Sequence, residues 1–304
     1  MTEGFIEVAD GRVWYTIVGE DRGGTPLLCL HGGPGMPHDY LEPLADLSDE
    51  RPVIFYDQLG CGISPAPAGG VTWTVQRFVE ELVAVREALG LDQIVLFGNS
   101  WGGMLALQYM FDCSPQVRGL ILSSTPVSVS RWLNDAAQLR SALPADVQDV
   151  LDSHERSGFF GCPEYQGAVA EFYRRHLCRM LPWPDCIERT FMGMGADVYM
   201  AMWGPSEFGP VTGELMDFEV VDRLGQISVP TLVTGGRFDE ARPEHMAVLA
   251  GGIPGAELSI FERSAHMAFV EERVAYMARL RAFLARIDDH STDSIGEAGA
   301  AGRY

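Results

Sequence analysis

The chain has 304 residues, of which 47% are hydrophobic and 21% charged, so it can bury the core of an ordinary globular enzyme. Its net charge of −20 argues against a nucleic-acid partner, because phosphate binding needs a basic face. No apolar run reaches the roughly 18 residues of a membrane-spanning helix, and the N-terminus lacks a secretory signal, so we expect no membrane partner and a cytoplasmic location.

All 22 basic residues are arginine, which excludes mechanisms that need a Schiff-base lysine, a phosphate-loop lysine or a Ser–Lys dyad. The simplest interpretation of the net negative charge is that it keeps the protein soluble, although it would also favour cationic substrates. The cysteines include no C-x-x-C pair, and the loose cluster of His176, Cys178 and Cys186 lacks zinc-finger spacing. We therefore predict no metal site.

In chain order, the first half alternates between strand-like and helical patterns. Apolar and polar residues alternate on both sides of Asp10-Gly11, which is typical of a β-hairpin. Short apolar runs typical of buried strands follow, with helical periodicity between the last three of them. The expected strands are 26–32, 52–58, 93–99 and 119–125, and the helices are 75–90 and 101–112. Such alternation predicts a mostly parallel sheet with helices on both faces.

Strand-like runs stop after Ser124 and resume only at 230–236 and 256–262, before an amphipathic helix at 271–287. The segment between them is rich in Trp, Met, Phe and Tyr and has helical stretches such as 163–177. We therefore predict one sheet domain with a helical lid inserted after the strand that ends near Ser124. The expected parts are a core of 1–126 and 226–287, a lid of 127–225 and a disordered tail of 288–304.

The motif Gly98-Asn99-Ser100-Trp101-Gly102 fits G-x-S-x-G, between the strand QIVLF and the helix MLALQYM. A serine on this sharp turn presents its hydroxyl at a helix N-terminus and at the carboxyl edge of the sheet. The strand–turn–helix context distinguishes the motif from an ordinary glycine-rich turn. We therefore predict the α/β-hydrolase fold, with Ser100 as nucleophile.

A second loop, His31-Gly32-Gly33-Pro34-Gly35, follows the strand PLLCL. A loop at this place in α/β-hydrolases offers backbone N–H groups to a developing oxyanion. The expected donors are the amides of Gly33 and Trp101. For His31 we favour bracing of the loop over proton chemistry.

The acid and the histidine of the triad must follow Ser100 in that order. Asp239 and His266 each come just after a predicted strand, which brings both to the same edge as Ser100. The rival acids Asp217 and Asp222 precede that strand. Of the rival histidines, His245 lies on an expected helix, 243–252, and His290 lies in the tail. Asp239 has a second interpretation as the N-cap of that helix. Asp57 ends another strand, but no helix follows as in an elbow, so we expect it to brace a loop.

Several motifs resemble the proline iminopeptidases, or prolyl aminopeptidases: HGGPG, YDQLGCGIS, GNSWGG, MWGPSEF, and GRFDE followed by SAHM. The nearest branch by this resemblance holds the tricorn-interacting aminopeptidase and related L-amino-acid amidases. The resemblance runs from residue 5 to residue 287. It implies hydrolysis of a small N-terminal residue, often proline, from a peptide or amide without a cofactor. It also implies that Glu207 and Glu240 bind the substrate's ammonium group.

Two positions depart from the family pattern. Ala-Arg-Pro follows Glu240 where the family has a small Val-Thr-Pro-like run, so Arg242 would weaken cation binding if it pointed inward. Ser206 replaces a common Asn. Some lid side chains are expected to line an apolar slot, among Trp132, Phe159, Phe160, Trp183, Phe191, Tyr199, Met202 and Trp203.

We therefore expect acyl transfer through a covalent intermediate on Ser100, with His266 as base and Asp239 orienting it. The same machinery would also suit an L-amino-acid amidase or an ester or amide tailoring hydrolase of a biosynthetic pathway. A non-enzymatic binding protein is the third hypothesis. The preferred residue, the leaving group and the oligomeric state do not follow from the sequence.

Overall fold

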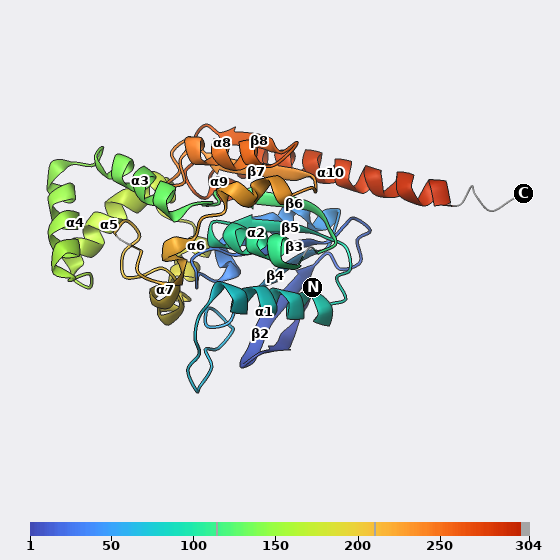
Figure 1. Cartoon of the computed structure of the whole chain (residues 1–304), viewed down its shortest axis with the longest axis horizontal. Coiled ribbons are helices and arrows are strands. Elements are labelled where there is room, and N and C mark those ends of the chain that lie inside the picture. The colour runs from blue at the N-terminus through green and yellow to red at the C-terminus, as the bar shows by residue number, and fades with distance from the viewer. Residues whose placement is uncertain (114, 210, 299–304) are drawn as a thin grey trace, which may run out of the picture.

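A single twisted sheet organises the computed structural model, which describes residues 1–113, 115–209 and 211–298, with side chains as far as Asp289. Its eight strands lie in the order β1-β2-β4-β3-β5-β6-β7-β8 (Figure 1). Their bounds are β1 Thr2–Val8, β2 Gly11–Val18, β3 Leu27–Leu30, β4 Val53–Tyr56, β5 Ile94–Asn99, β6 Val117–Ser123, β7 Thr231–Gly236 and β8 Glu257–Phe261. The predicted strands are all present.

Pairing in the sheet is parallel from β4 through β8, as the alternation of strands and helices predicts. The predicted N-terminal hairpin is also present, and Asp10 takes a left-handed conformation in its turn, with φ of 64°. Its second strand, β2, pairs antiparallel with β4. The carboxyl ends of β3, β4, β5, β7 and β8 therefore meet at one edge.

Helices cover both faces of the sheet. One face packs against α1 Val75–Ala88, α2 Trp101–Cys113 and α8 Pro243–Gly252. The other packs against the 3₁₀ segment η1 His38–Asp49 and the helices α9 Ala268–Glu271 and α10 Arg273–Ala298. Strand β5 shows why two cores form, because Leu96 points into the first while Val95 and Phe97 point into the second.

The chain between β6 and β7, here called the inserted segment, contains helices and no named strand among its described residues. Its elements are α3 Val129–Arg140, α4 Ala145–Ser157, α5 Pro163–His176, α6 Asp185–Met192, α7 Ala196–Met202, η2 Glu214–Asp217 and η3 Val221–Gln226. Figure 1 shows α3, α4 and α5 gathered to one side of the sheet, away from the end where α10 leaves the body. Around α4 and α5 the segment has a small core of its own, which includes Leu151, Phe172 and Phe208.

The last helix runs beyond its expected end. Residues 288–298, predicted to be disordered, continue α10 to Ala298, whereas 299–304 lie outside the described residues. One cause is a tertiary contact, because the Asp288 carboxylate accepts hydrogen bonds from the Thr25 hydroxyl at 2.7 Å and from Arg51 at 2.9 Å. None of the described helices is both long and apolar enough to cross a membrane.

Candidate active site

Ser100 occupies a strained turn between β5 and α2. Its φ is +53°, a conformation that a non-glycine residue rarely adopts, and a hydrogen bond of 2.9 Å from its amide to the Ser123 carbonyl holds the turn against β6. A Cβ at Gly98 would overlap the carbonyl of Gly102, and a Cβ at Gly102 would overlap that of Leu30. The glycines of the motif therefore make room for the turn that exposes the serine.

His266 and Asp239 come together as predicted. The Nδ1 atom of His266 lies 2.7 Å from Oδ1 of Asp239, and both residues are buried. The same carboxylate accepts the amide of Ala241 at 2.9 Å, which fixes its direction. With Nδ1–H donated to Asp239, the Nε2 atom is left for Ser100, which lines the same cavity. In the described part of the chain no hydrogen bond joins Ser100 to His266, and such contacts often tighten only in the substrate complex.

The rival residues lie elsewhere. Asp217 and Asp222 are exposed on η2 and η3. His245 is buried in α8, where its ring lies 3.2 Å from Asp135 and accepts the Val127 amide at 3.0 Å. The side chain of His290 lies outside the described residues. Asp239 does not cap α8, because the N-cap position of that helix is occupied by Arg242.

The loop after β3 brings the expected oxyanion donors next to Ser100. Gly33 has a φ of +111°, which only glycine adopts without strain. The Gly32 amide donates to the Tyr40 hydroxyl at 2.7 Å, and that hydroxyl donates to Asn99 at 2.8 Å, so Tyr40 ties this loop to the serine turn. Within the described residues, the amides of Gly33 and Trp101 donate to no other protein group. They are available to a developing negative charge.

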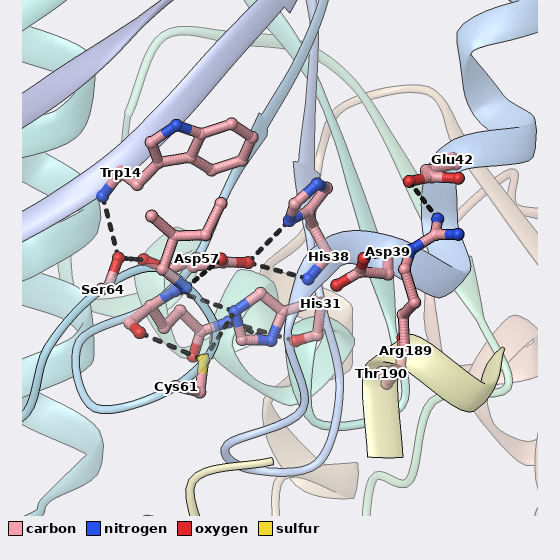
Figure 2. Close-up of polar contacts among 12 residues, drawn as sticks. Trp14, His31, His38, Asp39, Glu42, Asp57, Cys61, Ser64, Arg189 and Thr190 are labelled. Carbon is pink, nitrogen blue, oxygen red and sulfur yellow. Dashed lines mark hydrogen bonds and ion pairs between the residues drawn. The ribbon is translucent and has the colours of Figure 1, made fainter. Parts of the chain in front are cut away.

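A buried network of hydrogen bonds holds this loop in place (Figure 2). The His31 ring accepts the Gln58 amide at 2.9 Å, and burial lowers the pKa of His31 to about 4, so this histidine is neutral. Asp57 accepts both the backbone amide and the ring Nδ1 of His38, at 2.9 and 2.8 Å. The bracing roles expected of His31 and Asp57 are therefore present. The pairing of His38 with Asp57 was not predicted, because the two residues are 19 positions apart and no local sequence pattern indicates the contact.

Two carboxylates from different parts of the chain face the cavity that Ser100 and His266 line. Glu207 belongs to the loop after α7, and Glu240 follows Asp239. This Ser100 cavity is lined by Gly32, Gly33, Met36, Tyr40, Asn99, Ser100, Tyr173, Leu177, Thr190, Phe191, Glu207, Glu240, His266 and Met267. Among these described lining residues there is no arginine, so the two glutamates meet no basic side chain other than His266.

The Glu207 carboxylate is held in one direction by phenols. Its Oε2 atom accepts hydrogen bonds from Tyr199 at 2.6 Å and from Tyr173 at 3.3 Å. The backbone of its loop is fixed as well, because the Trp132 indole donates to the Glu207 carbonyl at 3.3 Å and the Trp203 indole to that of Ser206 at 3.2 Å. The roles of Tyr173 and Tyr199 depend on this fold and were not predicted.

The Glu240 carboxylate makes fewer hydrogen bonds than that of Glu207. One of its oxygens lies 3.6 Å from Nδ1 of His266, and the other, Oε2, is buried without a hydrogen-bond partner. Burial raises the pKa of Glu240 well above its usual value; His266 opposes this shift, and the carboxylates of Glu207 and Asp239 add to it. Burial also raises the pKa of Glu207. A buried carboxylate with an unused oxygen is suited to a cationic ligand, whose charge favours the ionised form of the carboxylate.

The two departures from the family pattern point away from the cavity. Arg242 contacts Gln138, Asp135 and Glu244, so it does not face the two glutamates. Ser206 is buried within the inserted segment and accepts the amides of Phe208 and Gly209 at 3.3 and 3.0 Å. Neither residue lines the Ser100 cavity.

Of the aromatic and methionine residues singled out in the inserted segment, Phe191 lines the Ser100 cavity, and Trp132 and Trp203 line a smaller pocket that Ser100 also lines. Trp183 stacks on Phe191, Met202 is core, and Phe159 is exposed. No group of three or more His, Cys, Asp or Glu among the described residues is placed to hold a metal ion.

Comparisons with known proteins identify the fold and the family of the chain. A family model described as alpha/beta hydrolase fold matches residues 25–158. A proline iminopeptidase of Heyndrickxia coagulans is 41% identical over 284 residues, which cover 93% of this chain and 98% of the relative. One from Clostridium botulinum is 38% identical, covering 95% of this chain and 99% of the relative.

Two solved structures are similar over almost their whole length. The proline iminopeptidase of Mycobacterium smegmatis superposes with a TM-score of 0.87 at 36% identity, covering 95% of this chain and 100% of the other. A protein named VinJ superposes with a TM-score of 0.90 at 38% identity, covering 94% and 99%. The predicted α/β-hydrolase fold is confirmed.

Proposed function

The chain belongs to the proline iminopeptidase family of α/β-hydrolases, and from that premise we propose that it is a serine hydrolase which releases N-terminal proline from peptides. The observation that carries the proposal is the pair of glutamates, Glu207 and Glu240, in one cavity with Ser100 and His266. An esterase for neutral substrates has no need of two buried anions beside its nucleophile.

The substrate end that fits this pair is a protonated amine. An N-terminal proline is a secondary ammonium with two N–H bonds, one for each carboxylate, and charged partners make such hydrogen bonds strong. The apolar side chains of Leu177, Phe191 and Met267 beside the glutamates suit a pyrrolidine ring. We propose that these contacts fix the N-terminal residue so that its carbonyl carbon lies against Ser100.

The chemistry that we propose is two-step acyl transfer. Ser100 attacks the proline carbonyl while His266 takes the hydroxyl proton through Nε2, and Asp239 orients and stabilises the imidazolium that forms. The amides of Gly33 and Trp101 would stabilise the oxyanion. The imidazolium then gives its proton to the leaving amine, and water activated by His266 hydrolyses the prolyl-enzyme.

We propose that the inserted segment restricts the site to the end of a peptide chain. It supplies Glu207, Tyr173 and Phe191 to the cavity that Ser100 lines. We propose that it is the lid of the site and that it admits only the first residue of a peptide to the glutamates. A cytoplasmic location remains a prediction from the sequence.

A panel of aminoacyl anilides tests the proposal, each compound being supplied with a free and with a blocked α-amine. We expect the free prolyl anilide to be the best substrate and its N-acetyl derivative to be inert. Covalent labelling of the protein by a fluorophosphonate, abolished in Ser100→Ala, is the expected companion result. Preference for blocked amines or for simple acyl esters would overturn the aminopeptidase function while leaving a serine hydrolase.

A further inference from the structure

In the free enzyme, acidic side chains around His266 outnumber basic ones. Asp239, Glu240 and Glu207 are three carboxylates near one imidazole. The chain has no lysine, and Arg242, the arginine nearest in sequence to Glu240, is turned toward Gln138, Asp135 and Glu244. Among the described residues that line the cavity, His266 is therefore the one side chain that can carry a positive charge.

Other titratable groups around the site do not correct this imbalance. On α9, both Glu271 oxygens are used by the amides of Arg179 and Ala265. At the end of α5, the His176 ring is bonded to the Phe238 carbonyl, and burial lowers its pKa, so it is neutral. The phenols around the two glutamates and Ser100 are uncharged and donate to Glu207 or Asn99. They are Tyr173, Tyr199 and Tyr40.

We propose that the two glutamates hold His266 as an imidazolium in the empty site, and that the substrate's ammonium group replaces it as their counter-ion. This inference rests on the proposed function. When the ammonium binds, the imidazolium loses its Nε2 proton to solvent, and Nδ1–H stays on Asp239. One cation enters and one proton leaves, so the charge of the site is conserved. The base becomes free only when a substrate with the right charge is present.

The pKa of His266 agrees in direction with the charge count. Burial disfavours the charged ring, but the carboxylate of Asp239, followed by those of Glu240 and Glu207, outweighs burial and raises the pKa of His266 to about 9. Burial also raises the pKa of both glutamates, and the attraction of His266 opposes that shift, so we place the shared proton on the ring, where it prevents His266 from accepting the Ser100 proton. A cation between Glu207 and Glu240 cancels their attraction for the ring proton and lowers the pKa of His266.

The glutamates would then favour a free-amine substrate in two ways, through binding and through the protonation state of His266. A neutral ester or a blocked amine gains no ion pair, and it also meets a histidine that is already protonated. A free amine both binds and frees the base. This places Glu240 as a positioning residue for the proton on His266 in addition to its contact with the substrate.

Nuclear magnetic resonance of the histidine rings in the full-length Ser100→Ala protein tests the proposal. This variant binds substrate without turning it over, and the His266 signal is assigned by its loss in Ser100→Ala/His266→Asn. We expect an imidazolium at neutral pH in the free protein and a neutral ring after addition of L-prolinamide, with a titration midpoint lowered by about two pH units. A neutral ring in the free protein, with the proton on a glutamate instead, overturns the proposal.

The Glu240→Gln variant and a matched control separate this role from a structural one. In the free protein, Glu240→Gln should lower the His266 midpoint by about one unit or more, because one attracting charge is lost. Glu244→Gln removes a carboxylate four residues further on that is 69% exposed, and it should leave the midpoint unchanged. Equal midpoints in all three proteins overturn the proposal.

Kinetics of the wild-type enzyme give an independent result. The pH profile of kcat/KM reports the free enzyme, whereas that of kcat reports the substrate complex. For a prolyl anilide, the acid limb of kcat should lie at lower pH than the acid limb of kcat/KM, and for a neutral ester the two should coincide. Coinciding limbs for both substrates overturn the proposal. Failure of L-prolinamide to bind at all would instead reject the proposed function, and this inference with it.

Discussion

Replacing Glu207 by glutamine is the sharpest test of how the substrate amine is recognised. The change removes a negative charge and keeps the shape of the side chain. Its carbonyl can still accept hydrogen bonds from Tyr199 and Tyr173, which lie 2.6 and 3.3 Å from Oε2. The loop backbone is held separately by the Trp132 and Trp203 indoles, so we expect the cavity to keep its form.

The magnitude follows from the burial of the pair. Removing one partner of a buried charge pair costs about 2–5 kcal/mol, which corresponds to a fall of roughly 30- to 5000-fold in kcat/KM. This loss should apply to a substrate with a free ammonium group. A neutral acyl ester makes no such pair, so its hydrolysis at neutral pH should not fall.

The assay compares kcat/KM for a prolyl anilide and a neutral nitrophenyl ester in wild type and Glu207→Gln. Glu214→Gln is the control, because that carboxylate is exposed on η2 and lies outside the cavity. Thermal unfolding of each variant excludes a general loss of structure. An equal fall for both substrates, or no fall for the anilide, would refute the recognition of the amine by Glu207.

Three further substitutions test the catalytic turn and the triad. Ser100→Ala should lower kcat by roughly 10⁶-fold at an unchanged melting temperature, and residual activity above about a hundredth of wild type would contradict its role as nucleophile. Asp239→Asn should cost on the order of 10⁴-fold because the amide favours the wrong imidazole tautomer, whereas the exposed Asp217→Asn should have little effect on turnover. Gly102→Ala forces a Cβ against a strand carbonyl and should destabilise the fold by about 1–3 kcal/mol, measured by urea denaturation. Gly251→Ala meets open space on α8 and should be neutral or slightly stabilising, so equal losses for the two glycines would argue against the packing explanation.

The parts of the site that follow strands could be predicted from the sequence. Ser100, Asp239 and His266 each come within five residues of the end of a strand, and parallel strands bring their carboxyl ends to one edge. The order of nucleophile, acid and histidine in the chain then leaves few candidates. Local pattern and fold rules are sufficient for these residues.

The substrate-binding side chains could not be predicted in this way. Glu207 was reached only through a family resemblance, because its loop has no periodic pattern. Tyr173 and Tyr199 face it from α5 and α7, and Tyr40 reaches Asn99 across 59 positions. Contacts of this kind depend on how the inserted segment packs, which hydrophobic spacing does not specify. The extension of α10 past residue 287 likewise depends on contacts of Asp288 with Thr25 and Arg51, more than 230 positions away.

One backbone carbonyl of the inserted segment has a mechanical consequence. The oxygen of His176, the last residue of α5, accepts the amide of Glu240 at 3.3 Å and the amide of His266 at 3.2 Å. The backbones of Glu240 and His266 thus share one hydrogen-bond acceptor at the end of α5. A hinge motion that lifted the end of α5 would break both bonds at once and dismantle the triad. We therefore expect peptides to enter by rearrangement of side chains and loops while the end of α5 keeps its position.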